Sequence, residues 1–303
     1  MPTVSPTLDA PPSPSAPEEP PSPDGWPGGL PALRAKLDRF DDGLHDLLMQ
    51  RAQVVEQVAR SGKPSAFRPG REAVIIRRLL ARHHGHLPPQ AIFRIWREML
   101  AGTTAMQGGF SLAVCDADPG AGITQLAREH FGALTPLRVH GSAGQALTEI
   151  GNGTASVAVL PFPSETETWW TALPHQEPRI HVIARLPFWT ARSEGAPAVE
   201  ALVVAATAPD ESGQDRSFLG LECDSDVSRT RLVAELTAAR LVPETLVLLR
   251  DPSGTLARVL VEVDGLLTDD DPRLLRLGTV LRRPVVLGGY AVPIGSVANA
   301  GAP

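Results

Sequence analysis

Apolar residues between Leu30 and Ser61 recur at steps of three and four, the spacing that places side chains on one face of an α-helix. A helix over this range would be roughly 45 Å long at ~1.5 Å per residue, which is longer than a small compact domain needs. The pattern therefore predicts a long helix that packs against a partner.

Two further helical patterns follow. The first runs from Arg71 to His83, before Gly85, a residue typical of helix ends. The second runs from Gln90 to Gln107, directly after two prolines that suit a first helical turn. The stretch from 30 to 107 thus predicts one long helix and two shorter ones.

Arg34 and Arg51 lie on the first predicted helix, 17 residues apart. Within one chain this separates them by roughly 25 Å along the axis and by about 100° around it. One small metabolite cannot bridge that distance. If both guanidinium groups bind one ligand, Arg34 must come from a second copy of the helix, packed antiparallel in a two-fold dimer.

The shorter helices carry further polar side chains. Arg71 and Glu72 open the second helix, and Thr103 and Gln107 stand at i and i+4 on the third, hence on one face. Because arginine suits bidentate binding of carboxylates, the expected ligand is a small dicarboxylate. Taken singly, each of these residues is more often a solvated surface residue.

The segments LRAKLDRFDDGLHDLLMQR, FRPGREAVIIRRLL and IWREMLAGTTAMQ resemble the all-helical chorismate mutase module of shikimate-pathway enzymes, which is often fused to prephenate dehydratase. The resemblance implies an isomerase that converts chorismate to prephenate, a step toward phenylalanine and tyrosine. It also implies an intertwined helical homodimer.

The resemblance also implies individual roles. Arg34 would reach across the dimer to one substrate carboxylate, and Arg51 would bind the other. Glu72 would accept from the substrate hydroxyl, while Lys63 and Gln107 would stabilise the ether oxygen. The further substrate-binding residues would be Arg68, Arg71 and Thr103.

The reaction explains why such a site needs no metal and no cofactor. A Claisen rearrangement is unimolecular, so the protein must hold the reactive conformer and place donors at the breaking ether oxygen. Losing one such donor typically costs ~2.7–4 kcal/mol of barrier.

After Gly109 the pattern changes to short apolar runs that alternate with helices. FSLAVCD, LRVHG, ASVAVLPF and RIHVIARLPF predict strands, and GITQLAREHFG and AGQALTEIGNG predict the helices between them, giving a largely parallel sheet. This part resembles the first lobe of prephenate dehydratase. The second lobe is missing, and the catalytic Thr-Arg-Phe of that family corresponds to Val199, Glu200 and Ala201. We therefore expect no dehydratase activity.

The last part predicts a βαββαβ arrangement. It has strands at EALVVAATA, SFLGLECD, TLVLLRD and RVLVEVDGLL, a helix at SRTRLVAELTAARL and a second helix at DDDPRLLRLGTVL. SGQDRSFLGLE resembles the start of an ACT regulatory domain, which would allow an aromatic amino acid as effector. The predicted fold class is α plus α/β. Its parts are a tail (1–28), the helical mutase module (29–108), a truncated α/β lobe (109–197), the ACT-like α+β domain (198–296) and a second tail (297–303).

Composition adds few constraints. The net charge of −6 lacks the basic excess expected for nucleic-acid binding. Residues 1–28 are rich in Pro, Ser and acidic residues and predict a disordered tail. We expect no membrane span and a cytoplasmic protein, and the two distant cysteines, Cys115 and Cys223, predict no disulfide framework.

Several motifs have a structural and a functional interpretation. His83, His84 and His86 could suggest a metal site, and Gly120 and Gly122 a phosphate loop, but a helix end and a strand-to-helix turn are favoured. Trp169 and Trp170 are more typical of packing than of a ligand cage. The run Asp269 to Asp271 is more typical of a solvated helix start than of a metal site.

Three functions remain open from the sequence. The first is a chorismate mutase with a non-catalytic C-terminal region. The second is a catalytically impaired ligand sensor or regulatory protein of the aromatic pathway. The third and least favoured is a bifunctional chorismate mutase/prephenate dehydratase. The position of Lys63 relative to Gln107 discriminates between the first two.

Overall fold

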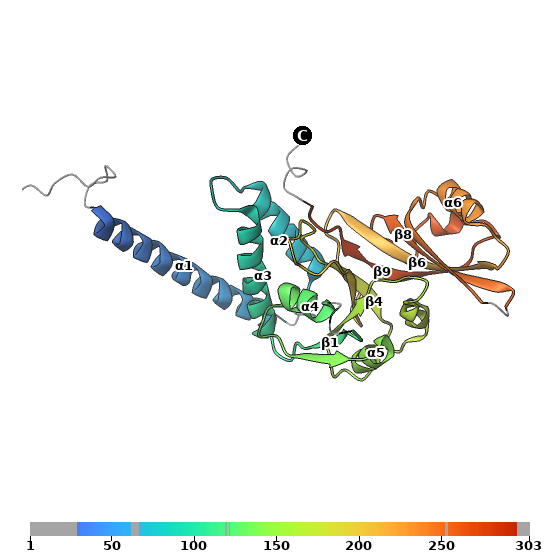
Figure 1. Ribbon diagram of the computed structural model, residues 1–303, viewed down its shortest axis with the longest axis horizontal. Helices are drawn as coiled ribbons and strands as arrows, with labels where there is room; N and C mark the ends of the chain where they lie inside the picture. Colours follow the sequence, from blue (N-terminus) through green and yellow to red (C-terminus); the bar gives the residue numbers. More distant parts are fainter. Residues whose placement is uncertain (1–28, 62–66, 119, 121, 252–253, 296–303) are drawn as a thin grey trace, which may run out of the picture. The chain divides into compact units, whose positions relative to one another are not determined.

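The computed structural model describes residues 29–61, 67–118, 120, 122–251 and 254–295 (Figure 1). The predicted tails at 1–28 and 297–303 lie outside these residues. The chain consists of two compact units, residues 1–55 and 56–303. The predicted mixture of a helical part followed by helices and sheet is confirmed.

Three helices open the described chain, with bounds within two residues of those predicted: α1 (Gly29–Arg60), α2 (Pro69–Ala81) and α3 (Pro89–Ala105). No residue of α1 is buried. Its apolar stripe remains largely exposed, with Phe40 at 58% and Leu44 at 59%. Helix α1 therefore carries an amphipathic face that the described chain does not cover.

A single nine-stranded sheet forms the centre of the second unit, in the order β2-β1-β3-β5-β4-β9-β6-β8-β7. Its strands are β1 (Leu112–Cys115), β2 (Leu137–His140), β3 (Val157–Pro161), β4 (His181–Leu186), β5 (Ala201–Ala205), β6 (Asp215–Asp224), β7 (Pro243–Arg250), β8 (Leu256–Asp264) and β9 (Arg282–Ala291).

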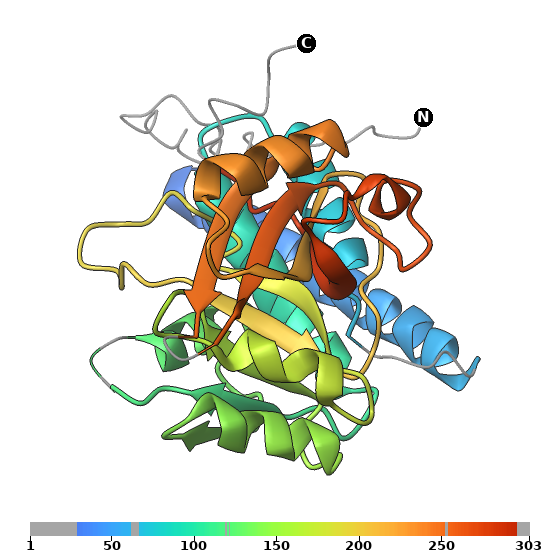
Figure 2. The ribbon, with the colours of Figure 1, turned by 90° about the vertical axis from the view of Figure 1, so that its right-hand side faces the viewer.

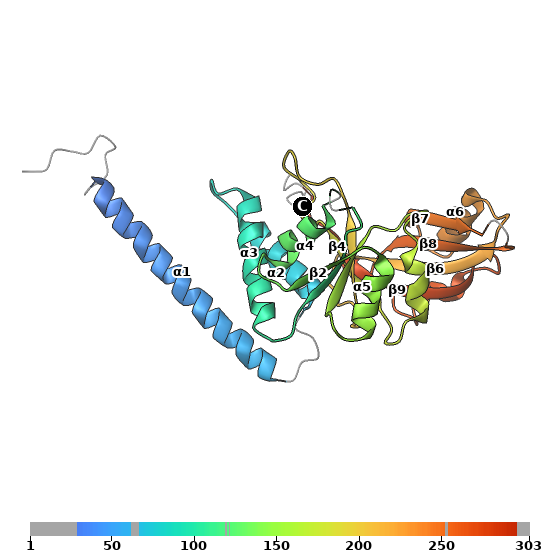
Figure 3. The same ribbon diagram turned by 60° about the horizontal axis from the view of Figure 1, so that its bottom comes forward.

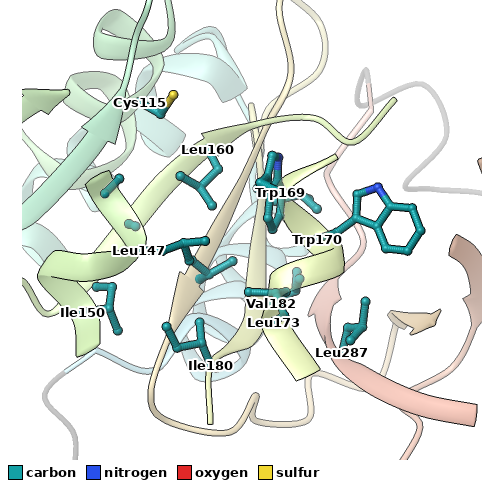
Figure 4. Packing of buried hydrophobic residues seen from close by; sticks show 14 of the residues in the cluster. Cys115, Leu147, Ile150, Leu160, Trp169, Trp170, Leu173, Ile180, Val182 and Leu287 are labelled. Carbon is teal, nitrogen blue, oxygen red and sulfur yellow. The ribbon is translucent and has the colours of Figure 1, made fainter. Parts of the chain in front are cut away.

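The first half of the sheet is covered on both faces. Strands β2, β1 and β3 are parallel, and the two predicted helices are present as α4 (Ile123–Phe131) and α5 (Ala143–Gly151). Successive β1 residues contribute to different clusters, Leu112 with α4 and Ala113 with α5. The α5 cluster also holds the 3₁₀ helix η1 (Trp169–His175), so Trp169 and Trp170 are packing residues (Figure 4).

Strand β5 differs from its predicted place. We expected EALVVAATA to open the ACT-like part, but β5 lies between β3 and β4 and is antiparallel to both. All five of its residues are buried. A fully apolar strand is stable in a doubly covered sheet centre, and this requirement places it in the first half.

The second half is antiparallel, with the strand order β9-β6-β8-β7. Helix α6 (Arg229–Ala238) packs on it through Leu232 and Leu236, and Figure 2 shows this helix in orange across the orange and red strands. The prediction of a second helix at DDDPRLLRLGTVL was wrong, because only the short η2 (Leu274–Arg276) forms there. Asp271 binds the backbone N–H and the guanidinium of Arg273, which stabilises a local turn instead.

The two halves of the sheet join between β4 and β9, where Val182 is the partner of Gly288. Gly288 has φ +118°, and a Cβ there would lie 2.2 Å from the Val182 carbonyl oxygen. Only glycine fits this close approach, so the position is required for a continuous sheet.

Helices α2 and α3 lie side by side and belong to the same unit as the sheet (Figure 3). Their buried faces share a cluster with residues at the ends of β4 and β9, with these members: Ala73, Ile76, Leu80, Leu100, Phe188, Trp189 and Ala291. Helix α3 also runs along α4. The two helices are therefore built into the α/β region.

Candidate functional site

The two arginines of α1 stand where the sequence predicted. Arg34 is exposed and Arg51 is half-buried. Their 17-residue separation lies on one continuous helix, so the distance of roughly 25 Å along the axis holds. By helical phase, Arg51 falls within the exposed apolar stripe and Arg34 lies about 100° from it.

Arg68 and Arg71 lie at the start of α2, where the helix cap comes from a distant residue. The Asp210 carboxylate accepts from the backbone N–H groups of Gly70 at 2.9 Å and Arg71 at 3.0 Å. It also lies 3.5 Å from Arg68 Nε. A Cβ on Gly70 would lie 2.1 Å from the Asp210 carbonyl oxygen, so this glycine permits the contact.

Glu72, the acceptor for the substrate hydroxyl that the resemblance implied, is buried beside Arg97. Its carboxylate accepts from Arg97 Nη1 at 2.9 Å, and the two side chains are only 8% and 4% exposed. Arg97 also donates to the His130 carbonyl oxygen from Nε at 3.0 Å and from Nη2 at 2.9 Å. Because a buried charge needs such partners, the pair fixes α2 to α3 and α4. The implied role of Glu72 as acceptor for a substrate hydroxyl stays a prediction.

Thr103 lies in the last turn of α3 and Gln107 in the turn that follows the helix, and both are half-buried. The Thr103 hydroxyl lies within hydrogen-bond distance of the carbonyls of Met99 and Leu100, at 3.1 and 3.0 Å. Gln107 Nε2 donates to the Thr103 carbonyl at 3.3 Å. Thr103 follows Arg97 by six residues, which turns it about 240° away around the helix. The side of α3 that contacts Glu72 is therefore not the side that carries Thr103.

Lys63 lies outside the described residues. Of the predicted site, the structure brings Arg68, Arg71 and Glu72 together at the start of α2. Thr103 on α3 lies near Gln107, which follows the end of that helix by two residues. The α1 arginines belong to the other unit.

Arg77, which the sequence did not single out, anchors the middle of α2. Its guanidinium donates to the Ser212 hydroxyl at 3.0 Å, the Gln214 carbonyl at 3.2 Å and the Val292 carbonyl at 2.7 Å. Burial lowers the pKa of Arg77, partly offset by Asp215. A guanidinium with this many protein acceptors acts as a structural cross-link.

Arg97 and Asp210 were also missed from the sequence. One signal for Arg97 was available, since it falls in phase with the buried positions Leu100 and Thr104. A charged residue on the buried face of a helix predicts a partner that is also buried. Asp210 gave no local signal, because its partner helix lies 140 residues away.

A second buried charge centre lies in the α/β region around Glu262. Its carboxylate accepts from Arg185 Nη1 at 3.1 Å, from the Thr245 hydroxyl at 2.5 Å and from the Tyr290 hydroxyl. Burial raises the pKa of Tyr290, and the Glu262 charge raises it further. Arg185 also binds Glu200, one of the three residues aligned with the dehydratase signature. These bonds join strands across the sheet and give Glu200 a structural partner.

Other site classes find no support within the described residues. No group of three His, Cys, Asp or Glu side chains there could hold a metal ion. Cys115 and Cys223 are both buried and free. In the same part of the chain, no helix has the length and apolar character needed to cross a membrane.

Comparison with known proteins supports the helical resemblance. Residues 33–108 match the family model described as "Chorismate mutase type II", so the chain carries a chorismate mutase domain in its N-terminal part. A bifunctional chorismate mutase/prephenate dehydratase of Pseudomonas aeruginosa is 27% identical over 147 residues, covering 46% of this chain and 40% of that protein. The protein of the same description from Stutzerimonas stutzeri is 26% identical over 146 residues. The matched part thus spans 40% of the length of these two relatives.

Solved structures also show similarity. A prephenate dehydratase from Streptococcus mutans aligns with a TM-score of 0.44 and 12% identity over 59% of this chain and 97% of that one. A quorum quenching acylase, GqqA, aligns with a TM-score of 0.45 and 15% identity over 59% of this chain and 94% of that one.

Proposed function

We propose that the chain is a chorismate mutase that acts as a homodimer through α1, with a C-terminal region that does not catalyse dehydration. The observation that carries the proposal is the exposed apolar stripe of α1 together with its two arginines. A second α1, packed antiparallel, would cover the stripe and bring the partner's Arg34 near Arg51.

The stripe has enough apolar surface to drive pairing. Eight large side chains on one face are between 43% and 62% exposed: Leu30, Leu37, Phe40, Leu44, Leu47, Leu48, Val54 and Val58. Full burial of such a side chain stabilises by about 1.5–3 kcal/mol, so the exposed half leaves about 1 kcal/mol each. Two helices would gain roughly 16 kcal/mol, comparable to or above the 4–15 kcal/mol estimated for the cost of association.

In this proposal the arginines position the substrate and the chain supplies donors at the ether oxygen. Arg34 of one subunit and Arg51 of the other bind the two carboxylates, with Arg68, Arg71 and Thr103 as further binding residues. Lys63 and Gln107 stabilise the negative charge that grows on the ether oxygen. Glu72 acts as a positioning residue for α2.

The second candidate is a catalytically impaired regulatory protein that binds an aromatic-pathway ligand. The Glu72–Arg97 pair favours it, because a carboxylate engaged in the protein interior is not offered to a substrate hydroxyl. Catalysis separates the two functions: a mutase turns chorismate over, and an impaired binder does not.

The direct test is loss of chorismate absorbance with the purified full chain. We expect prephenate as product and no phenylpyruvate. Phenylpyruvate formation from prephenate would overturn the non-catalytic C-terminal region, and a lack of chorismate turnover would leave the regulatory candidate.

A subunit-mixing experiment tests the shared site. Arg34→Ala and Arg51→Ala should each be inactive, while an exchanged mixture should regain about a quarter of full activity. Half of its dimers are hybrids, and each hybrid contains one site with both arginines. Arg39→Ala, an exposed arginine on the same helix, is the matched control. An inactive mixture after demonstrated subunit exchange would exclude a site shared between subunits.

A further inference from the structure

A pocket of about 510 Å³ lies at the edge of the sheet where strands β1 and β3 begin. Its walls come from the turn after α3, the C-terminal end of α5, the start of β3 and the residues that follow β5. All of these segments belong to the second compact unit. The volume falls in the range of small-molecule sites, and none of the predicted mutase residues lines it.

The lining of this pocket is uncharged. Among the described residues that form it there is no Asp, Glu, Lys, Arg or His side chain. An ion that enters such a site loses its hydration without gaining a counter-charge, which opposes binding. The pocket therefore favours a neutral molecule over a carboxylate, an ammonium ion or a zwitterion.

One corner of the pocket is aromatic. Phe110 is half-buried, and its ring centroid lies 5.5 Å from that of Phe67 with an interplanar angle of 50°. Phe131 packs against both rings, at 5.2 Å from Phe67 and 5.8 Å from Phe110. The apolar lining is completed by Ile150 and Val157, which are 3% and 2% exposed. Because packing holds the rings in place, they offer a fixed π surface to a planar ligand.

Two neutral polar side chains belong to the same pocket. Asn152 follows α5, and its backbone N–H donates to the Thr148 carbonyl at 3.0 Å, which leaves the side-chain amide exposed. Thr207 follows β5 and is also exposed. Neither the Asn152 amide nor the Thr207 hydroxyl has a hydrogen-bond partner in the part of the chain that the structure describes. An amide and a hydroxyl can together donate to and accept from a single ligand hydroxyl.

We propose that this pocket binds a neutral hydroxyaromatic compound of one or two rings. The ring would lie against Phe110 and Ile150, and the hydroxyl would bind Asn152 and Thr207. An aliphatic alcohol would leave the aromatic corner unused, and an aromatic acid would place its carboxylate where no cation lies. A neutral ring with a hydroxyl uses the aromatic corner, the apolar lining and the uncharged polar groups together.

The pocket also includes the linker between α3 and the sheet. Gly108 lines the pocket and directly follows Gln107, the predicted donor to the ether oxygen. Gly108 and Gly109 have φ angles of +88° and +68°, and an added Cβ at either would meet no other heavy atom within 4 Å. This linker is therefore loosely packed, and a bound ring would add contacts to it. The resulting restriction of Gln107 rests on the proposed mutase function, whereas binding itself does not.

The test is isothermal titration calorimetry of the purified full chain with 2-naphthol, without chorismate. The anionic isostere 2-naphthoate is the ligand control and should bind at least about tenfold more weakly. Ala206→Trp, which adds a large side chain at the pocket wall, should weaken 2-naphthol binding at least about tenfold. Asn152→Ala and Thr207→Val should each weaken it about fivefold through loss of one hydrogen bond. Thr255→Val, at an exposed threonine just before β8 and outside the pocket, should leave binding unchanged.

Three results would overturn the assignment: no 2-naphthol binding at millimolar concentration, 2-naphthoate binding as tight as that of 2-naphthol, or binding that no pocket variant weakens. The last result would place the ligand elsewhere, such as on the apolar stripe of α1. Circular dichroism checks the folding of each variant, and the two small substitutions keep the test valid if Ala206→Trp does not fold.

The outcome for the pocket is separate from that for the mutase. A chain that binds 2-naphthol in this pattern but does not turn over chorismate would refute the mutase proposal alone. A chain that turns over chorismate but does not bind 2-naphthol would refute the pocket assignment alone.

Discussion

The buried pair between Glu72 and Arg97 gives the sharpest prediction. Replacing Arg97 by Met removes one ion-pair partner from a carboxylate that is 8% exposed and two donors from the His130 carbonyl. Breaking a buried pair on one side typically costs about 3–5 kcal/mol. We therefore expect Arg97→Met to lower the free energy of unfolding by about 4 kcal/mol. Glu72→Gln should cost less, because the amide oxygen still accepts from Arg97.

Urea unfolding followed by circular dichroism measures these changes in a double-mutant cycle. The double variant Arg97→Met with Glu72→Leu should recover most of the loss, since an apolar pair of similar volume removes both charges together. Among molecules that remain folded, Glu72→Gln should keep the wild-type rate of chorismate turnover within about twofold, an activity ratio that corresponds to only about 0.4 kcal/mol. A large loss of turnover with unchanged stability would refute the structural role of Glu72 and restore its contact with substrate.

Three further predictions concern α1, the cap of α2 and a buried histidine. Leu44→Glu should raise the dimer dissociation constant at least about hundredfold, measured by analytical ultracentrifugation, whereas Ala35→Glu on the opposite face of α1 should not. Asp210→Ala should lower the free energy of unfolding by about 1 kcal/mol through loss of the α2 cap, with the exposed neighbour Glu211→Ala as control. Burial holds the pKa of His130 well below its usual value, with a further contribution from Arg97, so only the unfolded state takes up a proton just below pH 6.5. Stability should then fall by about 1.4 kcal/mol per pH unit as the pH drops from about 6.5, and His130→Phe should remove this part of the urea-midpoint shift.

Elements governed by local periodicity were predictable from the sequence. Helices α1, α2 and α3 have bounds within two residues of the apolar patterns, because a 3.6-residue repeat and terminal Pro or Gly act over short distances. The strands of the first half were predictable for the same reason. The neighbours of β5 were not, since its pairing with β3 and β4 depends on contacts between segments distant in sequence.

The candidate site was also only partly predictable from the sequence. The positions of Arg34 and Arg51 on α1 and of Arg71 on α2 were predictable from the sequence, because spacing along a helix fixes them. The roles of these residues stay predictions. The surroundings of Glu72 were not predictable, because they depend on which face of α2 meets α3. The family pattern identified this carboxylate, and tertiary packing determines what it binds.

Helix α2 shows why the helical and α/β regions must be considered together. Its first turn is capped by Asp210, its middle is bonded by Arg77 to Ser212, Gln214 and Val292, and Glu72 is held by Arg97, which in turn binds the His130 carbonyl. Most of these partners lie beyond residue 108, so the start of α2 depends on the sheet and its connecting loops. A thirteen-residue helix is marginal in isolation, and these contacts supply the stability that its own hydrogen bonds cannot. The α/β region therefore acts as the support on which the mutase-like helices α2 and α3 are positioned.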